Sequence, residues 1–413
     1  MLLSTSAYSS EFPARFKRFE EALGAPLWKK RAAKLREEIR GNRYLQQYLT
    51  EENRIVFALD RIASHLAEKR ALPTLEIEDI GQYEAVTFVH QCVDLFDSLR
   101  KPTAKAFVGR VKGCMQNPDD MRGLALEILV ATNLIKGGCS VGVPDVGTFD
   151  WLAEIRTNEF EIECKSLSRD AGQPIHQRPA HGLARLAKLE MHRIIRNLSK
   201  GLVIDLCVPE RLPTDQRRQR ELSNLIKRAL LRAQSVNETQ GSCAISEFDL
   251  EECPLTSSPN EKAIRDFVQK QLGIRDSWIV CFYDPGKYTV FLSIRSGVSN
   301  RVVEAAINVA KYAADNQLTG YRPGALFIKF ESLTGLDLED VGREEKSNPT
   351  NLRIQTSQFL HSGRNHVAWI TFLADGRVIQ KKDSAYTREG VTYTFENSKS
   401  KFGKLTLPEF ITT

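Results

Sequence analysis

Two runs of alternating apolar and polar residues, at 149–155 and 159–167 in the stretch FDWLAEIRTNEFEIECKSLS, constrain the fold of this 413-residue chain most strongly. Side chains of a β-strand alternate between the two faces of a sheet, so this period of two predicts two strands joined by a short polar turn. The apolar face would comprise Phe149, Trp151, Ala153, Ile155, Phe160, Ile162 and Cys164. We therefore expect a β-hairpin with one face against a hydrophobic core.

The opposite face of the hairpin carries acidic and basic side chains. A two-residue turn at Thr157-Asn158 would place Asp150 directly across from Lys165. Any two-residue or four-residue turn keeps the same parity, so Asp150, Glu163 and Lys165 are expected on one face. Asp145 has the opposite parity and would need a β-bulge to join them.

Two carboxylates and an ammonium on one strand face match the requirements of a divalent-cation site. Mg²⁺ prefers hard oxygen ligands and is typically held by one or two carboxylates together with substrate phosphates. A neighbouring lysine, here Lys165, would orient an attacking water or help to deprotonate it. The alternative interpretation is a solvated outer face, on which a Glu-x-Lys pattern is common.

Glu127 is the only charged residue in the apolar run GLALEILVATNLI, inside a helix expected at 119–136. Burying a carboxylate among apolar side chains costs free energy unless another group pairs with it. Glu127 therefore either joins the acidic face of the hairpin or lies at the rim of its helix. The sequence leaves both interpretations open.

The order of predicted elements indicates a mixed α/β protein of several parts. Residues 1–110 show helical spacing of apolar residues and predict a helical N-terminal domain. Residues 111–238 combine the helix, the hairpin and a continuously apolar strand at 201–208, and form the predicted core. Residues 239–413 predict a C-terminal α/β region that could continue the core sheet, with a hairpin turn at Asp375-Gly376.

The charge of the chain is concentrated in one segment. The whole chain carries a net charge of +6, whereas residues 165–235 hold 15 Lys and Arg against 6 Asp and Glu, a net charge of +9. A basic segment next to a candidate acidic site suits a polyanionic partner such as nucleic acid. The eight cysteines form no CxxC pair, which argues against a thiolate zinc site. With no leader-like start and no membrane-length apolar run, we expect a cytoplasmic protein without a membrane partner.

The stretch FDWLAEIRTNEFEIECKS resembles the core hairpin of the PD-(D/E)XK nuclease superfamily, and the resemblance spans about 119–210. It implies a restriction-endonuclease-like mixed sheet flanked by helices. It also implies that Asp150 and Glu163 bind metal and that Lys165 activates water. Glu127 would complete the site as the helix acid, and the backbone carbonyl of Cys164 would be a further ligand.

This sequence departs from the family pattern in two places. The literal Pro-Asp pair is Pro144-Asp145, five residues before Asp150, so the identity of the ligand aspartate stays open at this point. Neither Gln173 nor Gln177 has a tyrosine four residues later, so the Gln-x-x-x-Tyr motif of the RecB-like exonuclease branch is missing.

The resemblance and the charge together predict a nuclease that uses Mg²⁺, with Mn²⁺ as a substitute. DNA is favoured over RNA, and an endonuclease of the restriction or phage-defence (antiviral) type fits the layout by analogy. A homodimer or a partner protein of the same system is expected. The first alternative is an inactive nucleic-acid-binding or partner-binding scaffold on the same fold. The second is a structural α/β protein with a solvated hairpin face.

Several polar residues downstream of the hairpin are candidates for contact with nucleic acid. They follow the second strand or lie on an expected basic helix near 214–234, where a solvated helix face is the competing interpretation. They are Ser166, Ser168, Arg169, His176, Gln177, Arg178, His181, Arg217, Arg218 and Arg220. The histidines have no partner at metal-ligand spacing, so we do not expect them to bind metal.

Overall fold

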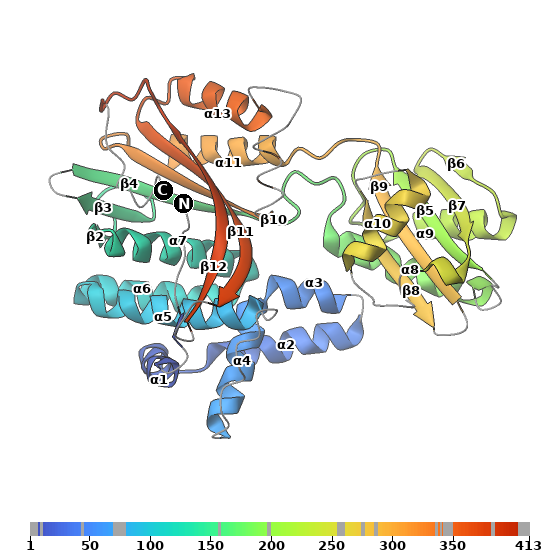
Figure 1. Ribbon diagram of the computed structural model, residues 1–413, viewed down its shortest axis with the longest axis horizontal. Helices are drawn as coiled ribbons and strands as arrows, with labels where there is room; N and C mark the ends of the chain where they lie inside the picture. The colour runs from blue at the N-terminus through green and yellow to red at the C-terminus, as the bar shows by residue number, and fades with distance from the viewer. Residues whose placement is uncertain are drawn as a thin grey trace. The chain divides into compact units, whose positions relative to one another are not determined.

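The computed structural model is a mixed α/β protein, as the order of predicted elements indicates (Figure 1). It describes the chain except residues 1–6, 9–10, 43–44, 69–79, 156–157, 196–199, 254–260, 274–276, 285–287, 335–337, 339–340, 342–349, 381–384 and 404–413. Two compact units are present. Unit 1 comprises Met1–Glu37, Leu49–Ala171 and Arg301–Thr413, and unit 2 comprises Glu38–Tyr48 and Gly172–Asn300.

These units differ from the predicted division of the chain. The predicted boundaries after residues 110 and 238 fall inside unit 1 and unit 2, respectively. The stretch 172–300 is inserted between two segments of unit 1, so the resemblance over 119–210 continues past the end of the compact unit that holds the hairpin. Sequence order alone did not reveal the insertion because both units alternate helices and strands.

Helices make up the N-terminal part of the chain, as predicted. They are α1 (Phe12–Leu23), α2 (Leu27–Gly41), α3 (Leu45–Glu52), α4 (Arg54–Ala67), α5 (Ile80–Ser98), α6 (Lys101–Cys114) and α7 (Pro118–Lys136). Helix α5 is buried almost all round, which explains the lack of a polar stripe in its sequence. A short strand, β1 (Ala7–Tyr8), pairs with β12 (Ala385–Glu396).

A seven-stranded mixed sheet forms the centre of unit 1, in the order β1-β12-β11-β10-β4-β3-β2. Its further strands are β2 (Ser140–Gly142), β3 (Trp151–Ile155), β4 (Asn158–Leu167), β10 (Gly324–Thr334), β11 (Val367–Gln380) and β12 (Ala385–Glu396). Strand β4 is antiparallel to β3 and parallel to β10. Helices α11 (Val302–Asn316) and α13 (Asn351–His361) cover one face and α7 covers the other (Figure 1). Strand β4 is therefore central, and β10–β12 extend its sheet.

The register of the hairpin differs from the prediction by two residues. Trp151 lies opposite Ile162, and Ile155 pairs with Asn158 at the start of β4, so Asn158 belongs to a strand rather than to the turn. The turn residues 156–157, including the predicted Thr157, lie outside the described residues. A shift of two preserves parity, so the predicted faces are correct although the predicted partners are not.

Unit 2 contains a five-stranded sheet in the order β6-β7-β5-β9-β8. The strands are β5 (Gly201–Val208), β6 (Val236–Glu238), β7 (Gly241–Phe248), β8 (Trp278–Asp284) and β9 (Tyr288–Ser296). Helices α8 (Gln177–Ile195) and α9 (Gln216–Arg232) pack on one face, whereas α10 (Glu261–Leu272) and the short helix η1 (Leu250–Glu252) lie on the other. Strand β5 is buried on both faces, as its apolar run predicts, but it does not belong to the sheet of the hairpin.

Candidate active site

The acidic face of the hairpin contains Asp150, which lies immediately before β3. Its backbone N–H donates a hydrogen bond to the carbonyl oxygen of Ile162 at 3.0 Å. Its side-chain Oδ2 accepts a hydrogen bond from the backbone N–H of Cys164 at 2.8 Å. Two main-chain contacts to β4 thus place the Asp150 carboxylate beside Glu163, where the alternation of the two strands had predicted it.

Glu163 is fully buried on β4, with 0% of its surface exposed. The ammonium of Lys165 lies 2.5 Å from its Oε1. Within the described part of the chain, neither carboxylate oxygen accepts a hydrogen bond of ordinary geometry. A charged carboxylate that is buried without hydrogen bonds lowers the stability of the fold, because it has lost its water and the Lys165 ammonium alone compensates among the described residues.

Glu161, two residues earlier on the same face, shows what a satisfied buried glutamate looks like in this sheet. It is also 0% exposed. Its Oε2 accepts a hydrogen bond from the backbone N–H of Thr319 at 2.8 Å, and its Oε1 accepts one from the hydroxyl of the same residue. Glu161 therefore stabilises the loop after α11, whereas Glu163 has no such hydrogen bonds and is compensated by the Lys165 ammonium at its Oε1.

Glu127 is buried on α7, 9% exposed, rather than solvated at the rim of its helix. The indole Nε1 of Trp151 donates to its backbone carbonyl at 3.1 Å, which fixes the helix against the start of β3. The Glu127 carboxylate forms an ion pair with Arg110. The structure thus brings the predicted helix acid to the two predicted strand acids.

Burial raises the pKa of all three carboxyl groups, and repulsion from Asp150 adds to the effect for Glu127 and Glu163. Burial, followed by repulsion from Asp150, raises the pKa of Glu127 to about 8. The same two causes raise the pKa of Glu163 to about 7. Burial also raises the pKa of Asp150, opposed chiefly by the hydrogen bond from the Cys164 N–H. A cation that neutralises the carboxylates of such a cluster therefore stabilises it.

Lys165 remains an ammonium at neutral pH. Burial alone would lower its pKa, but the carboxylates of Glu163 and Asp150 outweigh burial and raise it. In this state the side chain can donate hydrogen bonds and balance negative charge, whereas it cannot accept a proton. An ammonium is chemically suited to the first role predicted for Lys165, orienting water, and not to the second, deprotonating it.

Arg110 on α6 is a site residue that the sequence did not single out. One Nη2 atom contacts both acids, forming the ion pair with Glu127 and lying 3.5 Å from Asp150 Oδ1. Its guanidinium also lies over the ring of Trp151, 6.0 Å from the centroid. Arg110 looks like any basic residue of an amphipathic helix, and the only sequence signal is its place beside the buried residues Phe107 and Val111.

The chemical type of these donors, carboxylate oxygens, is the type that a hard divalent cation prefers. Three carboxylates converge, and the buried oxygens of Glu163 lack hydrogen bonds, as expected of groups that await a ligand. As the side chains stand, no group of three or more His, Cys, Asp or Glu residues within the described ranges is arranged to hold a metal ion. The side chains of Arg110 and Lys165 lie against these carboxylates, where a metal ion would otherwise balance their charge. Burial raises the pKa of the Cys164 thiol, so only its backbone remains as a candidate ligand.

Asp145 lies apart from this cluster. It is exposed and accepts hydrogen bonds from Arg322 at 2.8 and 3.0 Å, and this contact lowers its pKa. Arg322 also pairs with Glu159 at 2.6 Å. Of the two aspartates left open by the sequence, the structure therefore places Asp150 with Glu163, and Asp145 serves an exposed ion-pair network.

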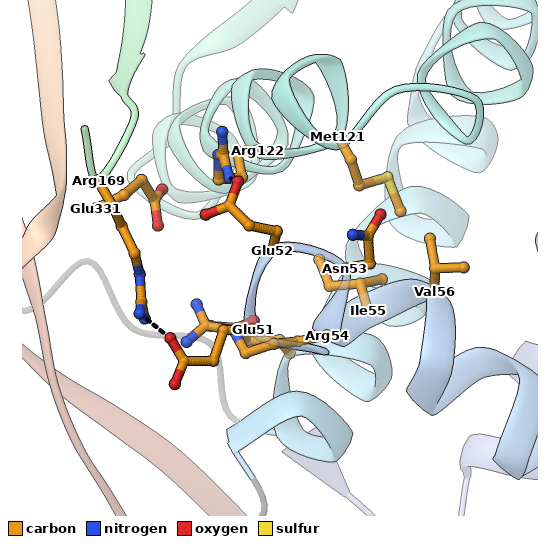
Figure 2. Close-up of a pocket in the computed structure, with 11 residues that line it drawn as sticks. Glu51, Glu52, Asn53, Arg54, Ile55, Val56, Met121, Arg122, Arg169 and Glu331 are labelled. Carbon is orange, nitrogen blue, oxygen red and sulfur yellow. Dashed lines mark hydrogen bonds and ion pairs between the residues drawn. The ribbon is translucent and has the colours of Figure 1, made fainter. Parts of the chain in front are cut away.

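The predicted nucleic-acid contacts divide between the two units. In unit 1, Ser166 donates to Glu331 at 2.9 Å and Arg169 pairs with Glu51, while Ser168 follows β4. Figure 2 shows Arg169 and Glu331 at a small cavity of about 30 Å³, which has room for about one water molecule and not for a substrate. The side chains of Ser166 and Arg169 are engaged in a hydrogen bond and an ion pair of the fold, so their assignment to phosphate contact gains no support.

The remaining predicted contacts belong to unit 2. Arg178 pairs with Glu38 at 2.6 Å. His181 is buried between the rings of Tyr48 and Trp278, and burial lowers its pKa to about 4. It is therefore a neutral core residue. His176 and Gln177 lie at the start of α8. The three predicted contacts on α9, Arg217, Arg218 and Arg220, are exposed.

Comparisons of this chain with protein-family models, with curated proteins and with solved structures found no match. Within the described residues, no helix is both long enough and apolar enough to cross a membrane.

Proposed function

We propose that this protein is a Mg²⁺-dependent nuclease of the PD-(D/E)XK type that hydrolyses phosphodiester bonds in DNA. The observation that carries the proposal is the junction of β3 and β4, where Asp150 is held beside the buried Glu163 and Lys165 lies 2.5 Å from Glu163. A solvated strand face would not bury a carboxylate completely and leave its oxygens without hydrogen bonds.

The fold of unit 1 supports the restriction-endonuclease-like part of the proposal. It has a mixed sheet flanked by helices, an Asp at the start of the strand before the Glu-x-Lys strand, and a Glu on the preceding helix. The fold alone does not decide the chemistry. The supporting point is that three predicted acids, from one helix and two strands, meet at one place.

The chain's own residues would contribute as follows. Glu163, Asp150 and Glu127 would hold the cation. When bound, Mg²⁺ would polarise the phosphoryl group and stabilise the charge on the leaving oxygen. The Lys165 ammonium would donate a hydrogen bond to the attacking water and offset charge at the phosphorus. The water oxygen would form a bond to phosphorus as the P–O ester bond breaks. The OH group of the water would stay on the phosphate monoester, and its other proton would pass through solvent to the leaving oxygen, which becomes a free hydroxyl.

DNA binding would use the outward faces of α8 and α9 in unit 2. Both helices bury most of their apolar residues against the same sheet, apart from the exposed Leu189 and Leu231, and leave basic side chains exposed. The exposed arginines are Arg178, Arg185, Arg193, Arg217, Arg218, Arg220 and Arg232. A surface of this kind suits the phosphate backbone of a duplex, because neutralised phosphates release counterions. A role in phage defence, and a homodimer that cuts both strands, extend this proposal by analogy.

One observation favours the alternative of an inactive nucleic-acid-binding scaffold. Arg110 and Lys165 already neutralise much of the carboxylate cluster, so the site could be a permanent ion-pair network. The complete set of Asp150, Glu163 and Lys165 argues for catalysis, because an inactive site has no need of all three.

The experiment is the incubation of supercoiled plasmid with the purified chain in Mg²⁺, Mn²⁺ or EDTA. Lys165→Ala is the test variant, and Lys105→Ala, an exposed lysine on α6, is the control. We expect metal-dependent nicking or linearisation by the wild type and the control, and none by Lys165→Ala. A closed circle has no ends, so cutting it identifies an endonuclease. If the wild type binds the plasmid but cleaves it in neither Mg²⁺ nor Mn²⁺, the result would support the inactive scaffold instead.

A further inference from the structure

Arg110 holds a position that a divalent cation would need. Its Nη2 lies 3.5 Å from Asp150 Oδ1 and contacts Glu127 Oε2. Two carboxylates from different elements, the helix α7 and the residue before β3, thus share one guanidinium nitrogen. A carboxylate oxygen that pairs with a guanidinium cannot ligate a metal ion in the same direction, so these two modes of neutralisation exclude each other at this place.

The structure shows how Arg110 is held, and the exposure of its side chain leaves it a path to solvent. Helix α6 is anchored by the buried side chains of Phe107, Val111 and Cys114, whereas the Arg110 side chain is 40% exposed. The guanidinium lies over the ring of Trp151, and such contacts contribute modestly at an exposed site. The backbone can therefore stay in place while the side chain rotates toward water.

Lys165 cannot replace Arg110 in this role. Its ammonium is engaged with Glu163 Oε1 at 2.5 Å, whereas Asp150 and Glu127 are paired with Arg110. If Arg110 leaves without a substitute, three carboxylates share one ammonium. Departure is favourable only when another cation arrives, so release of Arg110 and cation binding are coupled.

We propose that Arg110 is a built-in competitor of the divalent cation: it closes the carboxylate cluster in the metal-free protein and must swing out when the cation binds. This inference rests on the proposed function, because it concerns the same cation site. The apparent cation affinity of the wild type is then lower than the intrinsic affinity of the site, in proportion to the fraction of molecules in which Arg110 is released.

The test is a measurement of Mn²⁺ affinity by titration calorimetry on the full chain at one fixed pH, without DNA. Arg110→Gln removes the competing charge and keeps a polar side chain of similar reach. The control is Arg36→Gln, because Arg36 pairs with Asp60 at 2.6 Å and lies over the Phe57 ring at 5.8 Å, and so reproduces both contacts away from the cluster. We expect Arg110→Gln to bind Mn²⁺ about tenfold more tightly, and Arg36→Gln to match the wild type.

A second readout protects the test against loss of stability in the variant. Without metal, Arg110→Gln should unfold at a lower temperature, because its carboxylates have lost a cation. Saturating Mn²⁺ should then raise its unfolding temperature more than it raises that of the wild type. Arg110→Lys, which keeps the charge, should restore the wild-type response in both measurements.

The outcomes separate this inference from the proposed function. Equal Mn²⁺ affinity in the wild type and Arg110→Gln overturns the competition and leaves the metal site intact. Weaker binding by Arg110→Gln also overturns it, because Arg110 would then support the bound state. Absence of Mn²⁺ binding in every folded variant overturns the proposed function itself.

Discussion

The backbone N–H of Cys164 donates to Oδ2 of Asp150 at 2.8 Å. This hydrogen bond joins the residue before β3 to the middle of β4. The donor belongs to the main chain, so the position of the carboxylate depends on the pairing of two strands and not on a flexible side chain. The other oxygen, Oδ1, faces Arg110. Asp150 therefore has one oxygen fixed by the sheet and one directed into the cluster.

Asp150→Asn should separate the structural role of this residue from its charge. The amide oxygen of asparagine can still accept the Cys164 N–H, so we expect the variant to fold. The loss of the negative charge should lower the plasmid cleavage rate by about 100-fold or more, the size of effect found when one electrostatic group of a site is removed. Asp145→Asn is the matched control and should cleave at the wild-type rate. The opposite ranking would assign the ligand role to Asp145.

Glu127 should make the metal-free protein less stable at alkaline pH. Its pKa is raised from 4.5 to about 8 in the folded chain, so the folded state binds the proton more tightly than the unfolded state does. The stability that this proton contributes is complete below about pH 4.5 and is lost as the pH rises through 8. Glu163, with a pKa of about 7, acts in the same direction.

Urea unfolding in EDTA at several pH values between 5 and 9 measures this effect. The free energy of unfolding of the wild type should fall across that range. Glu127→Gln carries no titrating group at this position, so its curve should be flatter. Parallel curves for the two proteins would show that Glu127 has an ordinary pKa and that the cluster is less tightly coupled than the structure indicates.

The sequence was sufficient for the faces of the hairpin and for most local elements. Alternation with a period of two is a local property, and it placed Asp150, Glu163 and Lys165 together without any knowledge of the sheet. The exact pairing was wrong by two residues because the turn sets the register, and the turn sequence RTNE fits more than one position. A shift of two residues leaves each side chain on the same face of the sheet, so the prediction of the two faces was unaffected.

Long-range pairing could not be read from the sequence. Strand β4 needs a buried parallel neighbour, and both β5 and β10 are apolar enough for that place. The structure pairs β4 with β10 and gives β5 to the sheet of unit 2. An apolar run specifies burial and not the partner strand, so the insertion of 172–300 was invisible. Arg110 was missed for a related reason, because its partners lie on other elements.

Asp375 illustrates a local signal that the tertiary structure overrides. Asp375-Gly376 predicts a hairpin turn, but the pair lies within β11, where the register shifts between Asp375 and Val378 as in a β-bulge. Glycine supports both features. The Asp375 carboxylate lies 2.7 Å from Lys329 and 3.0 Å from Arg388. Burial would raise its pKa, but these two cations lower it to about 2.

Asp375→Ala should destabilise unit 1 strongly. Lys329 and Arg388 are at most 15% exposed, and without Asp375 they would be left close together with less compensation. We expect a loss of about 2–4 kcal/mol in the free energy of unfolding, as found when one partner of a largely buried ion pair is removed. Urea unfolding measures the change. Asp315→Ala removes an exposed partner of Arg364 and is the control; it should cost less than about 1 kcal/mol. Equal losses would mean that the Asp375 cluster is effectively solvated.

The basic face of α9 offers a test of DNA binding that is independent of cleavage. Arg217, Arg218 and Arg220 are exposed. Among the described residues, Arg217 pairs with Glu221 at 3.3 Å and Arg218 with Asp215 at 3.7 Å, both on or next to the same helix. Such weak surface pairs leave the guanidinium groups free to contact phosphates. Each phosphate contact contributes about 0.9 to the slope of log affinity against log salt concentration.

Replacement of these three arginines by glutamine should therefore weaken binding to duplex DNA and reduce the salt slope by about 2–3. Fluorescence anisotropy of a labelled duplex between 50 and 200 mM salt, in EDTA so that no cleavage occurs, measures both quantities. The control is a triple replacement of Lys29, Lys30 and Lys34, three exposed lysines of α2, which changes the net charge equally. If both triple variants reduce the slope alike, the effect comes from net charge alone. If only the arginine variant does so, the outer face of α9 contacts the DNA backbone.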